Sequence, residues 1–424
     1  MKFRKSNAWI VETEHTIPVM REVDVLVAGG GPAGMCAALA AARTGARTML
    51  VERYGCLGGI WTAGLVNPLF EYANKGAILA DLVTALKTAG GWGGLWNMCF
   101  DGEQMKLLLD RMALEAGIDV LMHTLIVESL VEDGVVRGVV VENKNGRGAI
   151  LARVTIDCTG DGDVAARAGA SFGKGRSNDG LTQSMTLMFR VGGVKFQQKD
   201  ASDLYSVIRQ FAPEEAAGLT HNKPWIINLP RPGEAVVQMT HMLRMDGTRA
   251  EDLTAASMEG RRQVARAMEI FRKCASRLGD VYLIETAMQI GVRETRRIIG
   301  DYVITEDDLV TGRTFEDGMV TASFGIDIHS PDSADQIVRP VKPYWIPYRS
   351  QLPNGLEQIL TAGRCISGTH EAHAAYRVTG TCAAMGHVAG TAAAMSVCAG
   401  VSPRKLPIDA LKAVLAEQGL VCLP

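Results

Sequence analysis

Three glycines and one carboxylate near the N-terminus have the types and spacing of a dinucleotide-binding site. Gly29, Gly31 and Gly34 form a Gly-x-Gly-x-x-Gly pattern, and Glu52 follows 18 residues after Gly34. Glycines let the chain turn tightly and let a pyrophosphate approach bare backbone, while a helix that begins there directs its free N–H groups at the anion. A carboxylate at the position of Glu52 can accept the hydroxyl protons of a ribose.

The order of the surrounding segments supports this interpretation. An apolar run at 24–28 precedes the glycines and predicts a buried strand, an alanine-rich segment follows them, and a second apolar run at 48–51 ends at Glu52. Strand, glycine turn, helix, strand and acid in this register are typical of a dinucleotide-binding βαβ unit. The alternative is a glycine-rich turn in an ordinary βαβ unit.

A glycine pair in the next loop favours FAD over a nicotinamide cofactor. Gly58 and Gly59 lie shortly after Glu52, where an extended FAD must pass to deliver its isoalloxazine ring elsewhere. A domain that binds only a nicotinamide dinucleotide has no particular need for this pair. No second strand–glycine–helix unit follows, so we do not expect a separate NAD(P)H domain.

Composition indicates a large soluble enzyme. The 424 residues favour two or more domains, and a net charge of −2 gives no sign of nucleic-acid or anionic-membrane binding. The nine cysteines include no Cys-x-x-Cys pair, which argues for reduced thiols in the cytoplasm and against cysteine-ligated clusters. Residues 1–21 lack an apolar signal core, and the small-residue stretch at 382–401 does not resemble a membrane span.

The rest of the chain predicts a mixture of helices and strands. A helix is expected at 103–116, followed by a three-strand meander with runs at 118–131, 135–142 and 149–157. Farther on, a strand at 358–363 precedes a helix of small residues at 381–398. Between the meander and the strand at 358–363 we expect strands at 186–191 and 235–241 and helices at 201–211, 251–277 and 280–299.

Several motifs together resemble the glutathione-reductase-type FAD superfamily, and within it the FAD-dependent oxidoreductases. The resemblance extends from about residue 20 to the C-terminus. It is carried by Gly29-Gly30-Gly31-Pro32-Ala33-Gly34, Glu52-Arg53-Tyr54-Gly55, Leu57-Gly58-Gly59, Asp157-Cys158-Thr159-Gly160-Asp161-Gly162-Asp163, Gly291-Val292-Arg293-Glu294-Thr295-Arg296-Arg297, Asp327-Ile328-His329, Ile346-Pro347-Tyr348-Arg349 and Ala362-Gly363-Arg364-Cys365-Ile366-Ser367.

The resemblance implies an α/β fold, with a Rossmann-type, glutathione-reductase-like FAD-binding domain that carries a β-meander and an inserted α+β substrate or cap domain. The expected boundaries are 20–165 for the first part of the FAD domain, 166–350 with part of 66–102 for the cap, 351–400 for the return to the FAD domain, and 401–424 for a C-terminal tail or helix.

The resemblance also implies which residues contact FAD. In relatives the C-terminal strand end meets the ribityl chain and pyrophosphate, and the next helix points its N-terminus at the flavin. An acid often follows the strand's glycine, whereas here Arg364 suggests a phosphate-binding or structural role. The expected cofactor residues are Gly29, Gly31, Pro32, Ala33, Gly34, Glu52, Arg53, Gly58, Gly59, Ile126, Thr159, Gly160, Asp161, Gly363, Arg364, Gly380 and Thr381.

Histidines, a tyrosine and an arginine are the candidates for catalysis. His370 and His373 directly follow the expected flavin strand, so either is a candidate acid or base, with Arg377 as an anion anchor. Their spacing also suits a metal site, but no third ligand is identifiable and we predict no metal. The competing interpretation is that both histidines hold a loop by hydrogen bonds. His329 and Tyr348 form the second set of candidates.

Three arginines lie close together in the sequence at 293, 296 and 297. One guanidinium is a candidate clamp for a substrate carboxylate, and the others are expected to be ion-paired with Glu294, Asp301 or neighbours. A structural role for each arginine is the competing interpretation.

These residues lead to the hypothesis of a two-electron oxidoreductase that passes a hydride between a small organic substrate and flavin N5. The electron acceptor or donor is unidentified, and a homo-oligomer is compatible with the sequence. The alternatives are a flavin-dependent monooxygenase and a flavin-carrying electron-transfer subunit of a larger complex, although the chain offers no cysteine run for an iron–sulfur cluster.

Overall fold

A seven-stranded sheet organises the chain. The computed structural model describes residues 16–420. The predicted absence of a signal core concerns residues 1–21, most of which lie outside this range. One strand, β19 (Ile359–Thr361), pairs with the C-terminal part of β8 (Gly146–Asp157), while β7 (Val135–Asn143) pairs with the N-terminal part of β8. Across the sheet the strands are β5 (Asp119–Leu121), β2 (Thr48–Val51), β1 (Val19–Ala28), β8 (Gly146–Asp157), β7 (Val135–Asn143) and β6 (Leu125–Glu132), with β19 (Ile359–Thr361) beside β8.

The register of this sheet brings four strand ends to one edge. Ala28 of β1 pairs with Val51 of β2 and with Asp157 of β8, and Thr361 of β19 pairs with the same Asp157. All of these pairings are parallel, so the carboxyl ends of the strands lie next to one another. Ligands of open α/β sheets bind in the crevice outside such ends.

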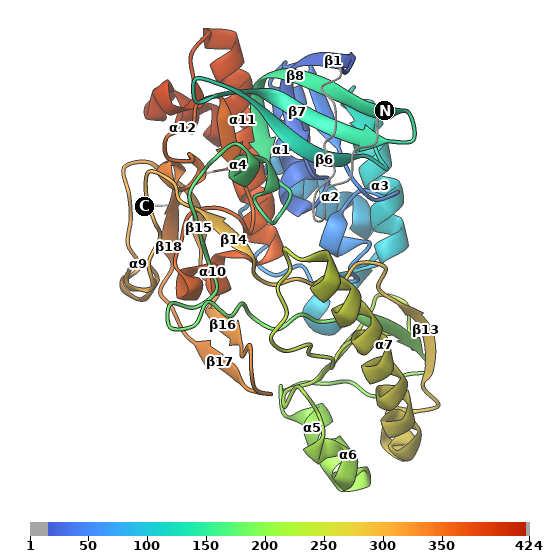
Figure 1. The fold of residues 1–424 in the computed structure, drawn as a ribbon. Coiled ribbons are helices and arrows are strands. Elements are labelled where there is room, and N and C mark those ends of the chain that lie inside the picture. The colour runs from blue at the N-terminus through green and yellow to red at the C-terminus, as the bar shows by residue number, and fades with distance from the viewer. Residues whose placement is uncertain (1–15, 421–424) are drawn as a thin grey trace, which may run out of the picture.

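Helices of small residues cover one face of the sheet. In Figure 1, α1 (Pro32–Arg43) lies beside α11 (Thr379–Ala399), the red helix, and the two pack closely. A methyl group at Gly386 or Gly390 would overlap a backbone carbonyl oxygen of α1. By length and composition α11 could cross a membrane, and 78% of its apolar window is buried in this packing. The same layer contains α2 (Ala77–Thr88), α3 (Gly102–Glu115) and α12 (Ile408–Glu417).

A second sheet, of four strands, has its own apolar core. Phe189 and Phe271 stack within it with ring centroids 6.4 Å apart. Figure 1 shows this part below the first sheet, with the long helix α7 beside it. The strands lie in the order β11 (Trp225–Asn228), β12 (Ala235–Gln238), β10 (Phe189–Gly192) and β13 (Tyr282–Thr286), and the helices are α5 (Asp203–Phe211), α6 (Pro213–Ala217), α7 (Ala250–Lys273) and α8 (Ala275–Leu278).

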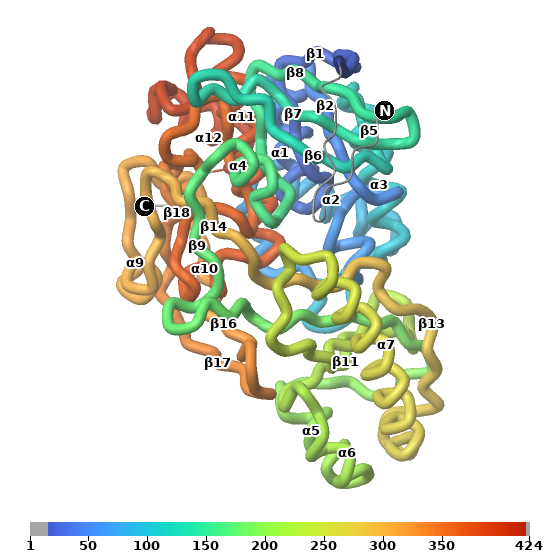
Figure 2. The backbone as a smooth tube through the Cα atoms, viewed as in Figure 1, coloured from blue at the N-terminus to red at the C-terminus, as the bar shows by residue number. Residues whose placement is uncertain are grey.

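Short two-stranded sheets and helices connect the two larger sheets, and the backbone tube of Figure 2 shows their course. The paired strands are β3 (Trp92–Gly93) with β4 (Cys99–Phe100), β9 (Phe172–Lys174) with β14 (Arg296–Ile298), β15 (Gly318–Ala322) with β18 (Tyr344–Pro347), and β16 (Ile326–His329) with β17 (Gln336–Arg339). The remaining helices are α4 (Asp163–Arg167), α9 (Glu306–Thr311) and α10 (His370–Tyr376).

Most predicted elements are confirmed, and two predictions need correction. The meander of β6, β7 and β8 is present, but the run at 118–131 divides into β5, which extends the parallel sheet, and β6. The predicted helix at 280–299 is wrong. Its first part forms β13 because Tyr282, Leu283 and Ile284 suit an edge strand that completes the ladder of β10, and its last part forms β14.

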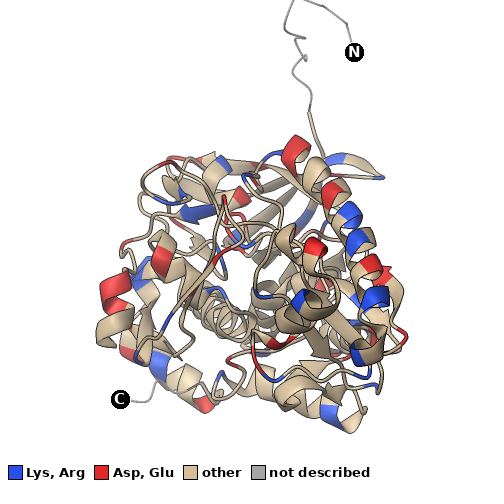
Figure 3. Cartoon of the chain, turned by 90° about the horizontal axis from the view of Figure 1, so that it is seen from below, with Lys and Arg blue, Asp and Glu red and all other residues tan. Residues whose placement is uncertain are grey.

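Charged residues are spread over the chain with both signs mixed. Seen from below in Figure 3, lysines and arginines alternate with aspartates and glutamates along the same helices. This view agrees with the near-zero net charge of −2. It gives no support to a polyanionic partner.

The contact between α1 and α11 predicts a strong effect of adding one methyl group. Gly390→Ala places that group against the carbonyl of Ala37, so we expect the free energy of unfolding to fall by about 1–3 kcal/mol through overpacking. Gly218→Ala is the matched control, because a Cβ there makes an ordinary 3.7 Å contact and we expect a change below about 0.5 kcal/mol. Urea denaturation measures both; equal midpoints for the two variants would contradict the packing argument.

Candidate active site

A cavity of about 610 Å³ begins where the four strands end and continues to the second sheet. Its wall on one side includes the glycine turn after β1, and on the other side it includes Trp225 and Ile227 of β11. A volume of this size is within the range of cofactor and substrate sites. The cavity therefore joins the predicted cofactor site to the second sheet.

The glycine turn brings backbone N–H groups to the cavity. Gly29 has a φ of +98°, which favours glycine, and a methyl group at Gly34 would overlap the carbonyl of Gly29. Apart from its two chain neighbours, no atom of residues 16–420 lies within 4 Å of the Cβ position of Gly31, so the space beside the turn is open. Pro32 occupies the first turn of α1, where no N–H is needed. The first-turn amides of α1 provide an anion site.

Glu52 is held in place by two backbone amides. Gly30 N–H donates to Glu52 Oε2 at 2.7 Å, and Tyr54 N–H donates to Oε1 at 2.9 Å. The carboxylate is buried and lines the cavity. Its remaining lone pairs can accept hydrogen bonds from a diol, as the sequence predicted for a ribose.

The turn after β8 lies directly beside the glycine turn, where a Cβ at Gly29 would be 2.7 Å from the carbonyl oxygen of Cys158. Asp157 fixes this turn by accepting from Thr159 N–H at 3.1 Å and from Thr159 Oγ1 at 2.7 Å. Asp161 accepts from Arg364 Nη2 at 3.1 Å and from Thr295 Oγ1 at 2.8 Å. Arg364 Nη1 is buried without a hydrogen-bond partner in the described chain. Its free N–H groups suit a phosphate, while its bond to Asp161 suits a structural role, so both roles expected for Arg364 stay open.

Most of the predicted cofactor residues meet at this cavity. Asp161 lines a smaller neighbouring pocket instead, and Gly34, Gly58, Gly380 and Thr381 do not line either one. Gly380 packs so closely against the backbone at Phe70 that a methyl group would overlap it. The predicted residues in the wall are Gly29, Gly31, Pro32, Ala33, Glu52, Arg53, Gly59, Ile126, Thr159, Gly160, Gly363 and Arg364.

Three of the five predicted catalytic residues lie away from the cavity. His370 Nδ1 contacts the buried carboxylate of Glu294 at 2.9 Å, so this histidine belongs to an internal ion-pair network. His373 is buried, neither of its ring nitrogens has a hydrogen-bond partner among the described residues, and burial lowers its pKa well below the ordinary value. Tyr348 donates to the carbonyl of Pro403 at 3.1 Å, and burial raises its pKa. His370 and Tyr348 thus make structural contacts, whereas His373 does not fit the interpretation that both histidines hold a loop by hydrogen bonds.

The other two candidates, His329 and Arg377, do line the cavity. Arg377 Nη2 donates to the carbonyl oxygen and the carboxylate of Asp327, at 3.0 and 3.3 Å. The two ring nitrogens of His329 have different neighbours. Nε2 lies 3.3 Å from Asp327 Oδ2, and Nδ1 lies 3.1 Å from Nε2 of a second histidine, His241. Burial and the nearby Arg293 lower the pKa of His329 to about 4, so the ring is neutral at pH 7.

The arginine cluster separates into one cavity residue and two structural ones. Arg297 pairs with Glu294, as expected, whereas Arg296 pairs with Asp163, a partner from a distant part of the sequence. Arg293 lines the cavity and donates to Ser184 O at 2.6 Å and to Thr186 Oγ1 at 2.8 Å. No carboxylate in the described chain forms an ion pair with it, and burial followed by the charge of Arg377 lowers its pKa to about 9.

Aromatic residues that the sequence did not single out form the cavity wall opposite the glycine turn. Phe70 lies 5.5 Å from Phe324 and 6.5 Å from Trp96, and Trp96 lies 5.3 Å from Trp225, measured between ring centroids. All four line the cavity. They come from segments up to 254 residues apart, so no local pattern in the sequence could have revealed them.

Comparison with curated proteins finds partial matches. The chain is 34% identical over 163 residues to a thiamine thiazole synthase of Aeropyrum pernix, which covers 35% of this chain and 59% of the relative. It is 29% identical over 207 residues to digeranylgeranylglycerophospholipid reductase 2 of Methanopyrus kandleri, which covers 45% of this chain and 50% of the relative. The chain therefore spans only 50–59% of the length of these relatives.

Solved structures share the fold over most of the chain. The flavin-dependent brominase Bmp2 superposes with a TM-score of 0.50 at 15% identity, covering 92% of this chain and 83% of the brominase. The protein BexE gives a TM-score of 0.50 at 14% identity, covering 93% of this chain and 66% of BexE. At this identity the likeness concerns the fold alone.

The family model for FAD dependent oxidoreductase matches residues 24–415, which include both sheets and the whole cavity wall. The match agrees with the resemblance seen in the motifs and with the parallel sheet whose strand ends carry the glycine turn. Proteins of this family are enzymes that use FAD. The chain belongs to the FAD-dependent oxidoreductase family.

Proposed function

We propose that the protein is a two-electron oxidoreductase in which FAD occupies the strand-end side of the cavity and a small organic anion occupies the side next to the second sheet. Bound FAD supplies hydride exchange at its N5 atom. The proposal includes a glutathione-reductase-like FAD domain with the second sheet as its cap. The single observation that carries the choice of substrate is the unpaired guanidinium of Arg293 in the cavity wall.

The residues present fit the cofactor. The open space beside Gly31 and the first-turn amides of α1 suit a pyrophosphate, and the doubly anchored carboxylate of Glu52 suits the adenosine ribose. The unpartnered Nη1 of Arg364 adds a donor for an anionic group. These features lie along one continuous wall that ends at Gly363, beside β19.

The rest of the cavity selects for an anion with an apolar body. The buried positive charge of Arg293 has no counter-charge of its own. Its hydrogen bonds go to uncharged oxygens, and the carboxylate of Asp327 pairs with Arg377. A substrate carboxylate there forms a charge-assisted hydrogen bond in a poorly solvated place, where such bonds are strong. The rings of Phe70, Trp96, Trp225 and Phe324 then contact the apolar part of the substrate.

Anaerobic mixing of the FAD-loaded enzyme with a panel of substrates tests this function. We expect visible flavin absorbance to bleach with hydroxy acids or amino acids that carry an apolar side chain, and not with the matching neutral alcohols and amines. Bleaching by the neutral compounds at equal rates would contradict the role of Arg293. A product that incorporates labelled oxygen, formed only with reductant and oxygen, would replace the proposal by monooxygenation.

The position of Glu52 predicts a specific loss of cofactor affinity. Glu52→Gln removes the charge and turns an N–H group toward one of the two backbone donors, so we expect FAD to bind about 10- to 100-fold more weakly, consistent with about 1.5–3 kcal/mol for a charged hydrogen bond. Titration of the apoprotein with FAD, followed by flavin fluorescence, measures this. Glu132→Gln, at an exposed strand end, is the control and should leave the affinity unchanged.

The unpaired charge of Arg293 predicts a loss of substrate binding without a loss of flavin. Arg293→Met keeps a similar volume, and we expect kcat/KM for a bleaching anion to fall at least about 30-fold, equivalent to about 2 kcal/mol, mainly through KM. Stopped-flow reduction of the flavin measures this. Arg349→Met is the control, because Arg349 pairs with Asp317 outside the cavity wall. Equal kinetics in both variants would show that the anion binds elsewhere.

A further inference from the structure

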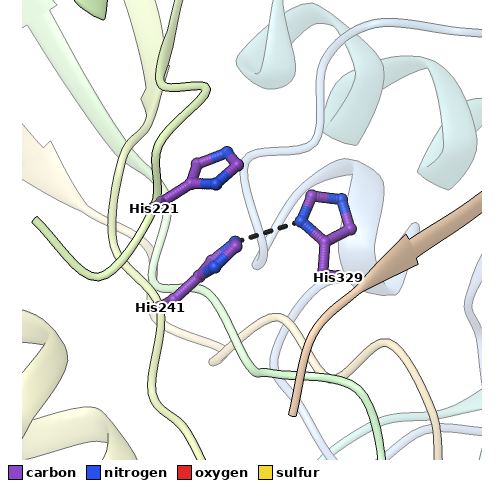
Figure 4. A group of neighbouring side chains, drawn as sticks. All are labelled: His221, His241 and His329. Carbon is purple, nitrogen blue, oxygen red and sulfur yellow. Dashed lines mark hydrogen bonds between the residues drawn. The ribbon is translucent and has the colours of Figure 1, made fainter. Parts of the chain in front are cut away.

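Three histidines from distant parts of the chain meet beside the cavity. His221 precedes β11, His241 follows β12, and His329 is the last residue of β16 (Figure 4). One ring nitrogen of each lies within 4.8 Å of the other two, and the closest pair, His241 Nε2 and His329 Nδ1, is 3.1 Å apart. The rings of His221 and His241 stack, with centroids 4.0 Å apart.

The histidine cluster is buried, and much of its hydrogen-bonding capacity is unused. The exposed fractions are 0% for His221, 0% for His241 and 2% for His329. Neither ring nitrogen of His221 has a hydrogen-bond partner in the described chain, nor does Nδ1 of His241. Buried polar atoms without partners are rare in proteins, and a bound ion or water is a common reason for them.

We propose that His221, His241 and His329 bind one divalent transition-metal ion of the Zn²⁺ or Fe²⁺ type at the wall of the substrate cavity. Imidazole nitrogens are preferred ligands of these ions, and three imidazoles leave a coordination position for a substrate or water. His329 also lines the cavity, which places the site where a substrate can reach it. The sequence predicted no metal because the three ligands are 20 and 88 residues apart and follow no short spacing pattern.

Groups around the cluster orient the ligands. Asp327 Oδ2 lies 3.3 Å from His329 Nε2, so a proton on Nε2 faces the carboxylate and leaves Nδ1 free to coordinate. The backbone N–H of His329 donates to Gln183 Oε1 at 3.1 Å, and that of His241 donates to Gln263 Oε1 at 3.0 Å. A carboxylate behind a ligating histidine is the usual supporting arrangement of metal sites.

The charges around the histidine cluster affect how readily it binds a cation. A metal ion binds the neutral form of imidazole, and all three rings lie buried with unpartnered nitrogens on His221 and His241. Arg293 and Arg377 raise the electrostatic cost of a cation, and the charge of Asp327 offsets part of that cost. A substrate anion beside Arg293 offsets more of it.

This site changes the role expected for His329. With Nε2 toward Asp327 and Nδ1 on the ion, His329 is a ligand and has no nitrogen left for moving a proton. The ion instead acts as a Lewis acid that polarises the group of the substrate nearest to it. Metal binding and flavin binding use different residues, so either can fail without the other.

Metal analysis of the purified chain tests the proposal. After removal of metals with a chelator, we expect the FAD-loaded protein to take up about one Zn²⁺ per chain. Co²⁺ should give visible bands at longer wavelengths than the flavin. His221→Gln and His241→Gln should each weaken Zn²⁺ binding at least about tenfold, and Asp327→Asn about 10- to 100-fold. His373→Gln is the matched control, since His373 is equally buried and unpartnered but lies outside the cluster.

The flavin content of every sample is measured alongside the metal content, which distinguishes failure of the metal site from failure of the flavoenzyme proposal. Wild-type protein with full flavin that binds neither Zn²⁺ nor Co²⁺ overturns the metal site. Binding that is unchanged in His221→Gln and His241→Gln overturns it as well. Should these variants fail to fold, X-ray absorption of the Zn²⁺-loaded wild type gives the answer: three imidazole nitrogens support the site, and sulfur ligands overturn it.

Discussion

The parallel pairing of β1 with β2 and β8 is the constraint on which the rest of the structure depends. Because Ala28 is level with Val51 and Asp157, the glycine turn, Glu52 and the turn at Thr159 all begin at one edge. The addition of β19 beside β8 brings Gly363 and Arg364 to the same edge from a point about 200 residues later. A shift of register by one residue would turn these groups to other faces.

Close helix packing keeps that edge in position. The glycines of α11 allow it to approach α1 until backbone meets backbone, and α1 in turn carries the anion-binding amides at its first turn. Displacement of α11 therefore moves the N-terminus of α1 relative to the strands. The glycines that allow this contact thus lie within the helix that is long and apolar enough to cross a membrane.

The half of the cavity next to the second sheet depends on charges held in a dry interior. Asp327 pairs with Arg377, Arg293 has no ion-pair partner in the described chain, and His329 lies beside Asp327. Such an arrangement favours ligands that bring negative charge. The cavity thus combines buried positive charge with an apolar wall next to the second sheet, while the strand-end side presents mainly backbone donors.

The sequence by itself determined the cofactor half of the protein. The glycine turn, Glu52, the meander and the helix at 379–399 follow from local patterns, because each depends on residues within one short segment and its hydrophobic period. The strand β13 escaped prediction because its partner, β10, decides its conformation.

Only the tertiary structure decided which polar residues reach the cavity. It removed His370, His373 and Tyr348 from the cavity wall and selected Arg293 from its cluster. It also brought His221 and His241 to His329. These outcomes depend on contacts between segments far apart in the chain, and burial, which sets the charge of each group, exists only once those segments have packed.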